Sequence, residues 1–102
     1  MQTITRKKIE ILADGPLVPR IVAALEEAGI AGHTVFPVLS GSGRGGQWSE
    51  ERLTGAETKQ LVMAITSEEH ATSLVDAIAP LLTTYQLLLT ITDVQVIRGD
   101  RF

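Results

Sequence analysis

Residues 58–82, TKQLVMAITSEEHATSLVDAIAPLL, decide the fold, because a strand pattern passes directly into a helix pattern there. The apolar run at the start of this stretch predicts a strand over residues 58–66. The sequence Thr66-Ser67-Glu68-Glu69 matches a capping box, which predicts a helix with Thr66 as its N-cap. Apolar residues then recur at helical spacing, and Pro80 predicts a kink or an early end of that helix.

The same order of strand and helix occurs nearer the N-terminus. Residues 7–13 alternate in the manner of a strand, and Asp14-Gly15-Pro16 ends it. Pro16 suits the first turn of a helix, where a missing amide hydrogen has no consequence. Apolar residues at helical spacing follow, and Gly29 is placed to end this helix.

Two further strands are predicted over residues 33–39 and 86–97. Strand, helix and strand therefore occur in that order twice. Two such units build the α+β, ferredoxin-like βαββαβ sandwich, a four-stranded antiparallel sheet with both helices on one face. We expect residues 1–102 to form this single domain, because a chain of 102 residues suffices for one compact domain.

The face of the sheet that the helices leave open is expected to be apolar. In the strand over residues 58–66, Leu61, Met63 and Ile65 point one way, while Val62 and Ala64 point the other. A monomer would carry polar side chains on its open face. We therefore expect a second copy of the chain to cover this face in a homo-oligomer.

The composition excludes several classes of function. Twelve Asp and Glu against nine Lys and Arg give a net charge of −3, which argues against a nucleic-acid partner. The chain has no cysteine, which excludes disulfides, thiolate catalysis and cysteine-ligated zinc. No run approaches the roughly 20 apolar residues of a membrane helix, so we expect no membrane insertion and a cytoplasmic location.

The sequence gives little reason to propose catalysis or a metal site. His33 begins a predicted strand and is interpreted as structural, and His70 is interpreted as part of a solvated helix face. Neither histidine belongs to a recognisable triad or metal-ligand cluster. We therefore expect a protein without a catalytic residue or a bound metal.

Residues 40–57 form a long polar segment in which a binding site is expected, because loops of this length in compact domains are often functional. Gly41, Gly43 and Gly46 match G-x-G-x-x-G, but no helix follows within a parallel βαβ unit, so a dinucleotide fold is rejected. Glycines let backbone N–H groups converge on an anion, and Arg44 adds a charged fork suited to phosphate. The alternative is a flexible hairpin tip without a ligand.

Other candidate residues lie in this segment and at the C-terminus. Trp48 is the only tryptophan, and it either anchors a partner protein or folds back on the sheet. Arg98 and Arg101 follow the last predicted strand, as solvated tail charges or as phosphate ligands.

Three stretches resemble the PII signal-transduction superfamily: KKIE at residues 7–10, AGIAGHTV at residues 28–35 and GRGG at residues 43–46. The similarity is greatest to the PII-like branch that is found with bicarbonate transporters and carboxysomes. It implies a homotrimer that binds adenine nucleotides in the clefts between neighbouring subunits. It also implies that the long loop changes conformation with the ligand and signals to a protein partner.

The resemblance also implies which residues bind the ligand. The base of the loop contacts the nucleotide, C-terminal arginines reach phosphate, and residue 86 falls where standard members carry a lysine. Carried onto this chain, the ligand-binding residues are Thr34, Gly41, Ser42, Gly43, Arg44, Gly45, Gly46, Gln86, Arg98 and Arg101.

Two departures from the standard pattern point to a specialised member. Residues 82–86, LTTYQ, lack the glycine and lysine of the standard phosphate loop, so AMP and ADP are favoured over ATP. The tyrosine that standard members modify in the long loop is absent, since Tyr85 is the only tyrosine. We therefore expect a role in inorganic-carbon metabolism, with bicarbonate as a second ligand and a bicarbonate transporter or carboxysome-related protein as partner.

Two other functions are compatible with this fold. An acylphosphatase-like enzyme would place an arginine-bearing phosphate cradle between the first strand and the first helix, but residues 14–17 contain no arginine. A trimeric structural or metal-tolerance protein would need no Gly-Arg loop and would retain no nucleotide.

Overall fold

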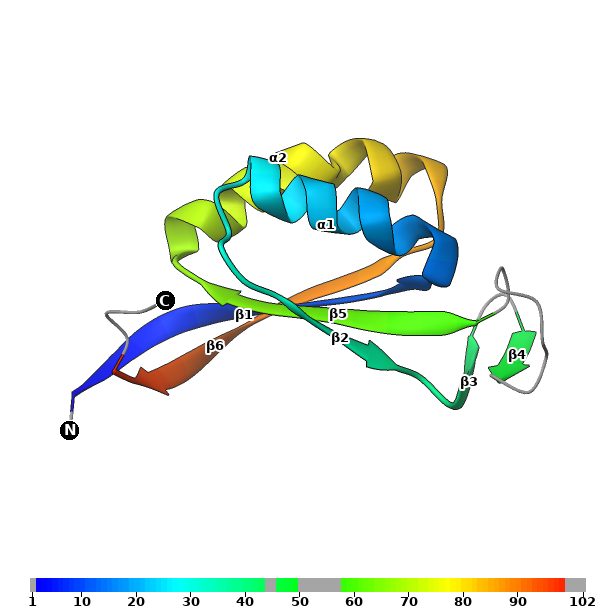
Figure 1. The fold of residues 1–102 in the computed structure, drawn as a ribbon, viewed down its shortest axis with the longest axis horizontal. Helices are drawn as coiled ribbons and strands as arrows, with labels where there is room; N and C mark the ends of the chain where they lie inside the picture. The colour runs from blue at the N-terminus through cyan, green and yellow to red at the C-terminus, as the bar shows by residue number, and fades with distance from the viewer. Residues whose placement is uncertain (1, 44–45, 50–57, 99–102) are drawn as a thin grey trace.

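The computed structural model describes residues 2–43, 46–49 and 58–98 (Figure 1). The first half contains β1 (Thr3–Asp14), a 3-10 turn η1 (Gly15–Leu17), α1 (Val18–Glu27) and β2 (Thr34–Pro37). Two short strands, β3 (Ser40–Gly43) and β4 (Gly46–Ser49), follow. The second half contains β5 (Lys59–Thr66), α2 (Glu68–Thr84) and β6 (Leu88–Ile97).

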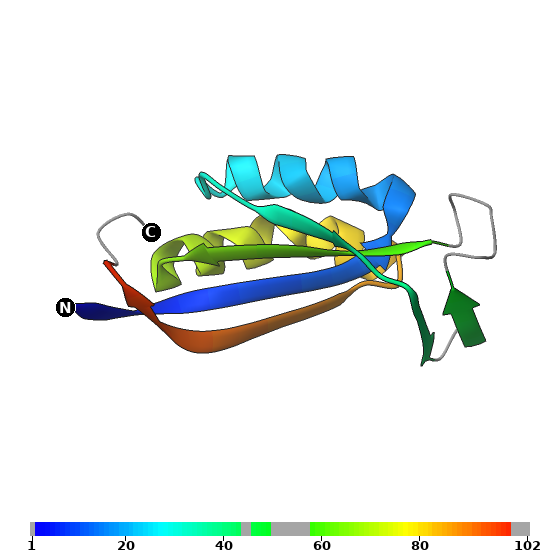
Figure 2. The same cartoon turned by 60° about the horizontal axis from the view of Figure 1, so that its bottom comes forward.

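The main sheet has four strands in the order β2-β5-β1-β6, and every neighbouring pair is antiparallel. Both helices cover the same face of this sheet (Figures 1 and 2). The central strand β1 pairs with β5 from Lys7 to Asp14 and with β6 from Thr3 to Leu12. The predicted α+β, ferredoxin-like sandwich is confirmed.

The hydrophobic core lies between the helices and the sheet. It is built from alternate positions of the strands and from the inner stripes of both helices, as antiparallel sheets with one covered face require. Its largest fully buried side chains are Ile9, Ile11, Ile21, Leu25, Val62, Leu74 and Ile78. Burial of each such side chain stabilises the fold by about 1.5–3 kcal/mol, before the opposing chain entropy is counted.

The predicted start of α2 is wrong by one residue. The N-cap is Ser67, whose Oγ accepts a hydrogen bond from the His70 backbone N–H at 3.2 Å. Thr66 cannot serve as the cap because it still belongs to β5, where it pairs with Lys7 of β1. Thr66, which the capping-box pattern assigned to the start of the helix, is therefore the last residue of β5.

Of the kink or early end predicted at Pro80, the early end is wrong, since α2 continues to Thr84. Proline removes one helical hydrogen bond, whose acceptor would have been the carbonyl of Asp76. Pro80 and Asp76 are both exposed, so water can satisfy that carbonyl. The hydroxyls of Thr83 and Thr84 donate to the Pro80 carbonyl, at 3.0 and 2.9 Å, and tie the last turn to the helix.

Part of the long segment after β2 forms a hairpin rather than an irregular loop. Strands β3 and β4 pair from Ser40 with Ser49 to Gly43 with Gly46, in a small sheet of their own. Figure 1 shows this hairpin beyond the end of the main sheet, next to the start of β5. The sequence did not predict these strands, because glycine and serine have low strand propensity and form no apolar alternation.

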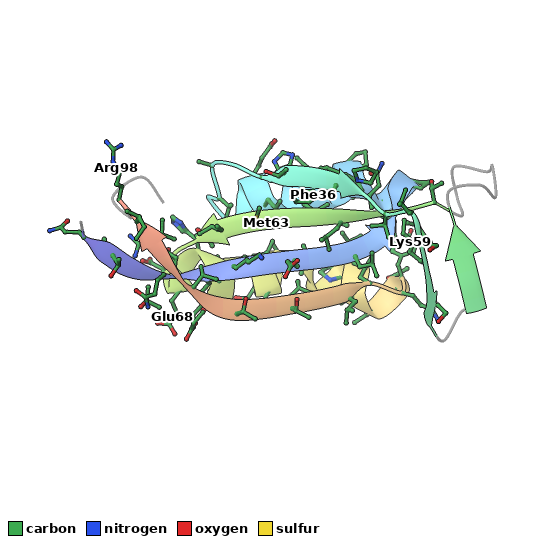
Figure 3. The ribbon with its side chains drawn as sticks, turned by 90° about the horizontal axis from the view of Figure 1, so that it is seen from below. Phe36, Lys59, Met63, Glu68 and Arg98 are labelled. Atoms are coloured by element: carbon green, nitrogen blue, oxygen red, sulfur yellow. The ribbon has the colours of Figure 1, made fainter. Side chains whose placement is uncertain are left out.

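The open face of the main sheet carries the apolar side chains that its pattern predicts. In β5, Val62 and Ala64 are buried under the helices, whereas Leu61, Met63 and Ile65 are only half-buried on the other face. Phe36 of β2 and Leu88 of β6 are 42% and 59% exposed. Figure 3 views this face from below, with Phe36 and Met63 on it.

We predict that the packing of α2 on the sheet can be measured with two neighbouring positions of the helix. Leu74 is fully buried and Val75 is 42% exposed. Leu74→Ala should lower the free energy of unfolding by about 2–5 kcal/mol, because it removes buried contacts and leaves a cavity. Val75→Ala, the matched control, should change it by about 0.5 kcal/mol or less. Equal losses in urea unfolding of the two variants would contradict this arrangement of the helix.

Candidate functional site

A hollow of about 640 Å³ opens at the end of the sheet where α1 finishes and α2 begins. Ligand pockets for small molecules commonly have volumes of roughly 300–1,000 Å³. Five segments form its walls: β1, the α1–β2 connection, β2, β5 and the start of α2. The lining residues are Arg6, Gly29, Ala31, Gly32, His33, Thr34, Met63, Ala64, Ile65, Thr66, Ser67 and His70.

The hollow exists because β2 is much shorter than β5. β2 pairs with β5 only from Gln60 to Met63, and β5 continues to Thr66. Along an antiparallel strand, backbone N–H and C=O groups point alternately to either side. The part of β5 beyond Met63 therefore offers backbone donors and acceptors along an edge that no described strand covers.

Gly29 turns the chain away from this edge after α1. Its φ of +82° lies in the left-handed region, and its N–H donates to the Glu26 carbonyl at 3.0 Å. The next amide, that of Ile30, donates back to Leu25 at 3.0 Å. The prediction that Gly29 ends the helix is confirmed. The turn at Gly29 forms one wall of the hollow.

His70 forms part of the helix-side wall. Its Nδ1 lies 3.5 Å from Thr66 Oγ1, and its ring packs over Gly29. A Cβ at Gly29 would lie 3.4 Å from His70 Nε2. The sequence indicated a structural role for His33 and a solvated helix face for His70, and the structure shows that both line the hollow. No spacing in the sequence indicates that the two histidines are neighbours, because they meet only where the α1–β2 connection approaches α2 in the fold.

Two of the predicted ligand residues lie at this end of the sheet. Thr34 lines the hollow from the first position of β2. Arg98 follows β6 with a φ of 65°, and its N–H donates to the Gln2 carbonyl at 3.3 Å. Figure 3 shows the Arg98 side chain extending from the sheet at this end.

The other described ligand residues lie at the opposite end. Gly41, Ser42, Gly43 and Gly46 belong to the hairpin, and Gln86 lies between the end of α2 and β6. β6 separates Gln86 from Arg98, and its ten residues span roughly 30 Å. One subunit therefore does not bring the predicted ligand residues together.

Some predicted site residues lie outside this description. Arg44, Gly45 and Arg101 are not among the described residues. Trp48 belongs to β4, where it pairs with Gly41, and its role as a partner anchor stays a prediction.

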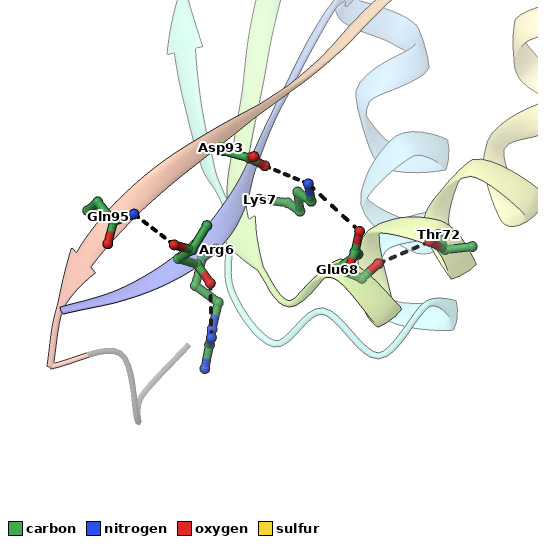
Figure 4. A network of polar contacts seen from close by, with 7 residues as sticks. Arg6, Lys7, Glu68, Thr72, Asp93 and Gln95 are labelled. Carbon is green, nitrogen blue, oxygen red and sulfur yellow. Dashed lines mark hydrogen bonds and ion pairs between the residues drawn. The ribbon is translucent and has the colours of Figure 1, made fainter.

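A polar network stands next to the hollow, between β1, β6 and α2 (Figure 4). Lys7 Nζ donates to Asp93 Oδ1 at 2.5 Å and lies 4.0 Å from Glu68 Oε1. The hydrogen bond to Asp93 raises the pKa of the Lys7 ammonium above its usual value; partial desolvation opposes this rise, and the charges of Asp93 and Glu68 add to it. The network joins the start of α2 to the two strands beneath it.

Two features are absent from the described part of the chain. None of its helices is long and apolar enough to cross a membrane. Its His, Asp and Glu side chains form no group of three or more that could hold a metal ion.

We predict that the wall formed by Gly29 requires glycine. Gly29→Ala should lower the free energy of unfolding by about 1–2 kcal/mol, because a Cβ disfavours the left-handed backbone. Gly32→Ala is the matched control, since a Cβ at Gly32 would meet nothing within 4 Å, and should change stability by about 0.5 kcal/mol or less. Urea unfolding that found the two variants equally stable would contradict this role of Gly29.

We also predict that Asp93 sets the titration of Lys7. Asp93→Asn should lower the pKa of Lys7 toward its usual value, as measured by NMR titration of the lysine Nζ. Because the folded-state pKa is raised, the pair stabilises the fold below the unfolded value of 10.5 and loses this effect as pH rises through the folded value. The control Glu10→Gln, which removes a neighbour of Lys8 instead, should leave Lys7 unchanged. An unaltered Lys7 pKa in Asp93→Asn would contradict the network.

Comparison with known proteins identifies the fold independently. The family model of nitrogen regulatory protein P-II matches residues 6–101. The structure of CPII from Thiomonas intermedia K12 bound to ADP and bicarbonate has a TM-score of 0.87 at 25% identity, covering 99% of this chain and 97% of that chain. CPII bound to ADP, AMP and bicarbonate has a TM-score of 0.89 at 24% identity, with 99% and 96% covered.

A chain from Thermus thermophilus that is assigned as a PII-like signaling protein has a TM-score of 0.85 at 21% identity, covering 100% of this chain and 99% of that chain. Comparison with curated protein sequences finds no match. The family match spans nearly the whole chain, and the fold agrees from end to end. The resemblance drawn from the sequence is therefore confirmed: this protein belongs to the nitrogen regulatory protein P-II family, as a PII-like member.

Proposed function

We propose that this chain is a non-enzymatic cytoplasmic regulator that binds an adenine nucleotide in clefts between the subunits of a homotrimer. AMP and ADP are favoured over ATP, and bicarbonate is the second ligand. Membership of a family of regulatory proteins supports the general role. The Thiomonas CPII structure with ADP and bicarbonate, at 25% identity, supports the choice of ligands.

The observation that carries this proposal is the division of the candidate residues between two ends of one subunit. The hollow with Thr34 and Arg98 lies at one end, and the glycine hairpin with Gln86 lies at the other. The two halves meet when one subunit's hairpin faces its neighbour's hollow. Such a head-to-tail contact is heterologous, and it generates a closed ring when the rotation between subunits closes.

The open face of the sheet supports the same assembly. Phe36 and Leu88, together with the half-buried residues of β5, leave apolar area that one subunit alone does not cover. Neighbouring subunits of a closed ring can bury such a face against one another.

The hollow suits the adenine base. Adenine offers an amino donor beside ring-nitrogen acceptors, which can pair with backbone groups along the uncovered edge of β5. Met63 and Ile65 supply apolar contacts for the flat ring, and Thr34 adds a hydroxyl. Apolar walls with a few placed polar groups are typical of nucleotide-sized pockets.

The other half of the cleft suits phosphate. Gly41 and Gly43 carry no side chain that would obstruct an approaching anion, and Arg44 adds a guanidinium from the same segment. Residues 82–86 contain neither glycine nor lysine, which limits the donors available to a third phosphate. This limit favours AMP and ADP over ATP.

The acylphosphatase alternative is disfavoured by the turn after β1. A phosphate cradle there would need free amide groups and an arginine. The Gly15 N–H is already bonded to the Thr58 carbonyl at 2.9 Å, and the nearest arginine, Arg20, donates to the Tyr85 hydroxyl at 3.0 Å.

We further propose that residues 40–57 report ligand occupancy to a partner in inorganic-carbon metabolism, such as a bicarbonate transporter or a carboxysome-related protein. Tyr85, the only tyrosine, follows α2 as its C-cap and lies far in sequence from this segment. Regulation by modification of a loop tyrosine is therefore disfavoured. Trp48 is the proposed partner contact.

We predict that calorimetric titration will show binding of AMP and ADP, weaker binding of ATP, and tighter ADP binding in the presence of bicarbonate. GDP, whose base has the reverse pattern of donor and acceptor at its ring edge, should bind at least about tenfold more weakly, since a mismatched pair is worth about 1–3 kcal/mol. Binding of no adenine nucleotide at millimolar concentration would contradict the proposed function.

We also predict that two variants that each abolish binding will complement one another. Thr34→Glu places a carboxylate in the hollow, and Ser42→Glu places one on the hairpin, so each should repel the anionic ligand. Mixed in equal amounts by unfolding and refolding, they should regain about one quarter of the sites, those with an intact hollow facing an intact hairpin.

Light scattering on each variant alone, and on the mixture, controls for loss of assembly. No recovery of ADP binding in assembled mixtures would show that one subunit holds both halves of the site.

A further inference from the structure

The open face of the sheet carries two opposite charges on its central strand, β1. Ile9 and Ile11 are buried under the helices, so Lys8 and Glu10, which alternate with them, point to the open face. Their side chains are 36% and 34% exposed, and Lys8 Nζ lies 3.9 Å from Glu10 Oε1. The two charges therefore lie on the face that the proposed ring covers.

Neutral side chains flank this pair on both sides. The strand register places Ile65 of β5 beside Lys8 and Met63 of β5 beside Glu10. Figure 3 shows Met63 on this face. The facing positions on β6 are both threonine. Within the described part of the chain, the 3.9 Å contact is the only hydrogen bond or ion pair that either charged side chain makes.

The contact between Lys8 and Glu10 is longer than a hydrogen bond, in which the nitrogen and oxygen lie about 2.7–3.2 Å apart. By comparison, Lys59 Nζ lies 2.7 Å from Asp14 Oδ1 at the other end of β1. Within one subunit, the Lys8 ammonium and the Glu10 carboxylate therefore lack a close partner and depend on water.

A partner that covers the open face removes this water. An ion buried without a counterion is strongly unfavourable. An apolar partner surface, or one of a single charge, would leave Lys8 or Glu10 unpaired. A second copy of this chain brings a carboxylate for Lys8 and an ammonium for Glu10, so the face is complementary in charge to itself.

We propose that Lys8 of each subunit pairs with Glu10 of the next subunit around the closed ring, and that these pairs set the register in which copies of the chain assemble. The proposal rests on the homotrimer of the proposed function and names side chains that hold it together. In a closed head-to-tail ring every Lys8 and every Glu10 then has a partner. A shifted contact leaves charges unpaired within an apolar surface.

The test is the protein concentration at which the assembly is half dissociated, measured by light scattering over a dilution series. Lys8→Glu and Glu10→Lys each place like charges at every contact and should raise this concentration at least about tenfold. The double variant Lys8→Glu/Glu10→Lys restores opposite charges and should return it to within about threefold of the wild-type value.

A mixture of the two single variants distinguishes pairing between subunits from pairing within one. Refolded together, Lys8→Glu chains meet Glu10→Lys chains at all but one of the contacts of a mixed trimer. Assembly should therefore recover at concentrations where neither variant assembles alone. Recovery in the double variant but not in the mixture would overturn the proposal, because the two charges would then act within one subunit.

Glu27→Lys is the matched control, since it changes the net charge as Glu10→Lys does but lies exposed on α1, in the helical layer. It should assemble as the wild type does and should not rescue Lys8→Glu in a mixture. Equal dissociation of Glu27→Lys and Glu10→Lys would overturn the proposal, because the net charge of the chain would then decide assembly.

Neutral variants repeat the test without introducing like charges, which guards against loss of the fold in the charge-reversed chains. Lys8→Gln and Glu10→Gln should each weaken assembly, and their effects should not add in the double variant, because both remove the same pair. Additive effects would overturn the proposal.

Failure of this proposal is distinguishable from failure of the proposed function. If the wild type assembles and binds ADP while the charge-reversed single variants assemble equally well, the pairing is refuted and the proposed function stands. If the wild type stays a monomer throughout the dilution series, the homotrimer and the pairing are both refuted.

Discussion

The short pairing between β2 and β5 is the constraint on which the candidate site depends. β2 pairs with β5 over four residues, whereas β5 has eight. The part of β5 beyond Met63 therefore keeps an uncovered backbone edge. Gly29, with its left-handed backbone, carries the chain away from that edge and leaves the hollow between the α1–β2 connection, the start of α2 and the sheet. A longer β2 would complete the sheet and remove the hollow.

The same subunit carries its two sets of candidate ligand residues at opposite ends of the sheet. β6 separates Gln86 and the hairpin side from Arg98 and the hollow side. A ligand that uses both sets must therefore lie between two copies of the chain. The apolar open face of the sheet and the division of the site thus have one explanation, the closed ring of subunits that we propose.

The fold was predictable from the sequence because strand and helix signals are local. Val62 and Ala64 alternate with Leu61 and Met63, and this alternation alone assigns the two faces of β5. The errors occurred where a residue had two competing uses. Thr66 fits a helix cap but pairs with Lys7 in the sheet, and Pro80 lacks a hydrogen bond whose acceptor is exposed to water.

The candidate site was only partly predictable. Thr34 was assigned through a family resemblance, and the structure brings it into the hollow. His33 and His70 could not be connected by spacing, because a turn and a strand end bring them to the same wall. The hairpin of β3 and β4 escaped detection because its residues carry no apolar pattern.

A crystal structure of the ADP complex tests the central claim most directly. The account predicts a ring in which the adenine contacts the β5 edge of one subunit while the phosphates contact residues 41–46 of the next. A nucleotide bound entirely within one subunit, or bound away from both the hollow and the hairpin, would contradict it.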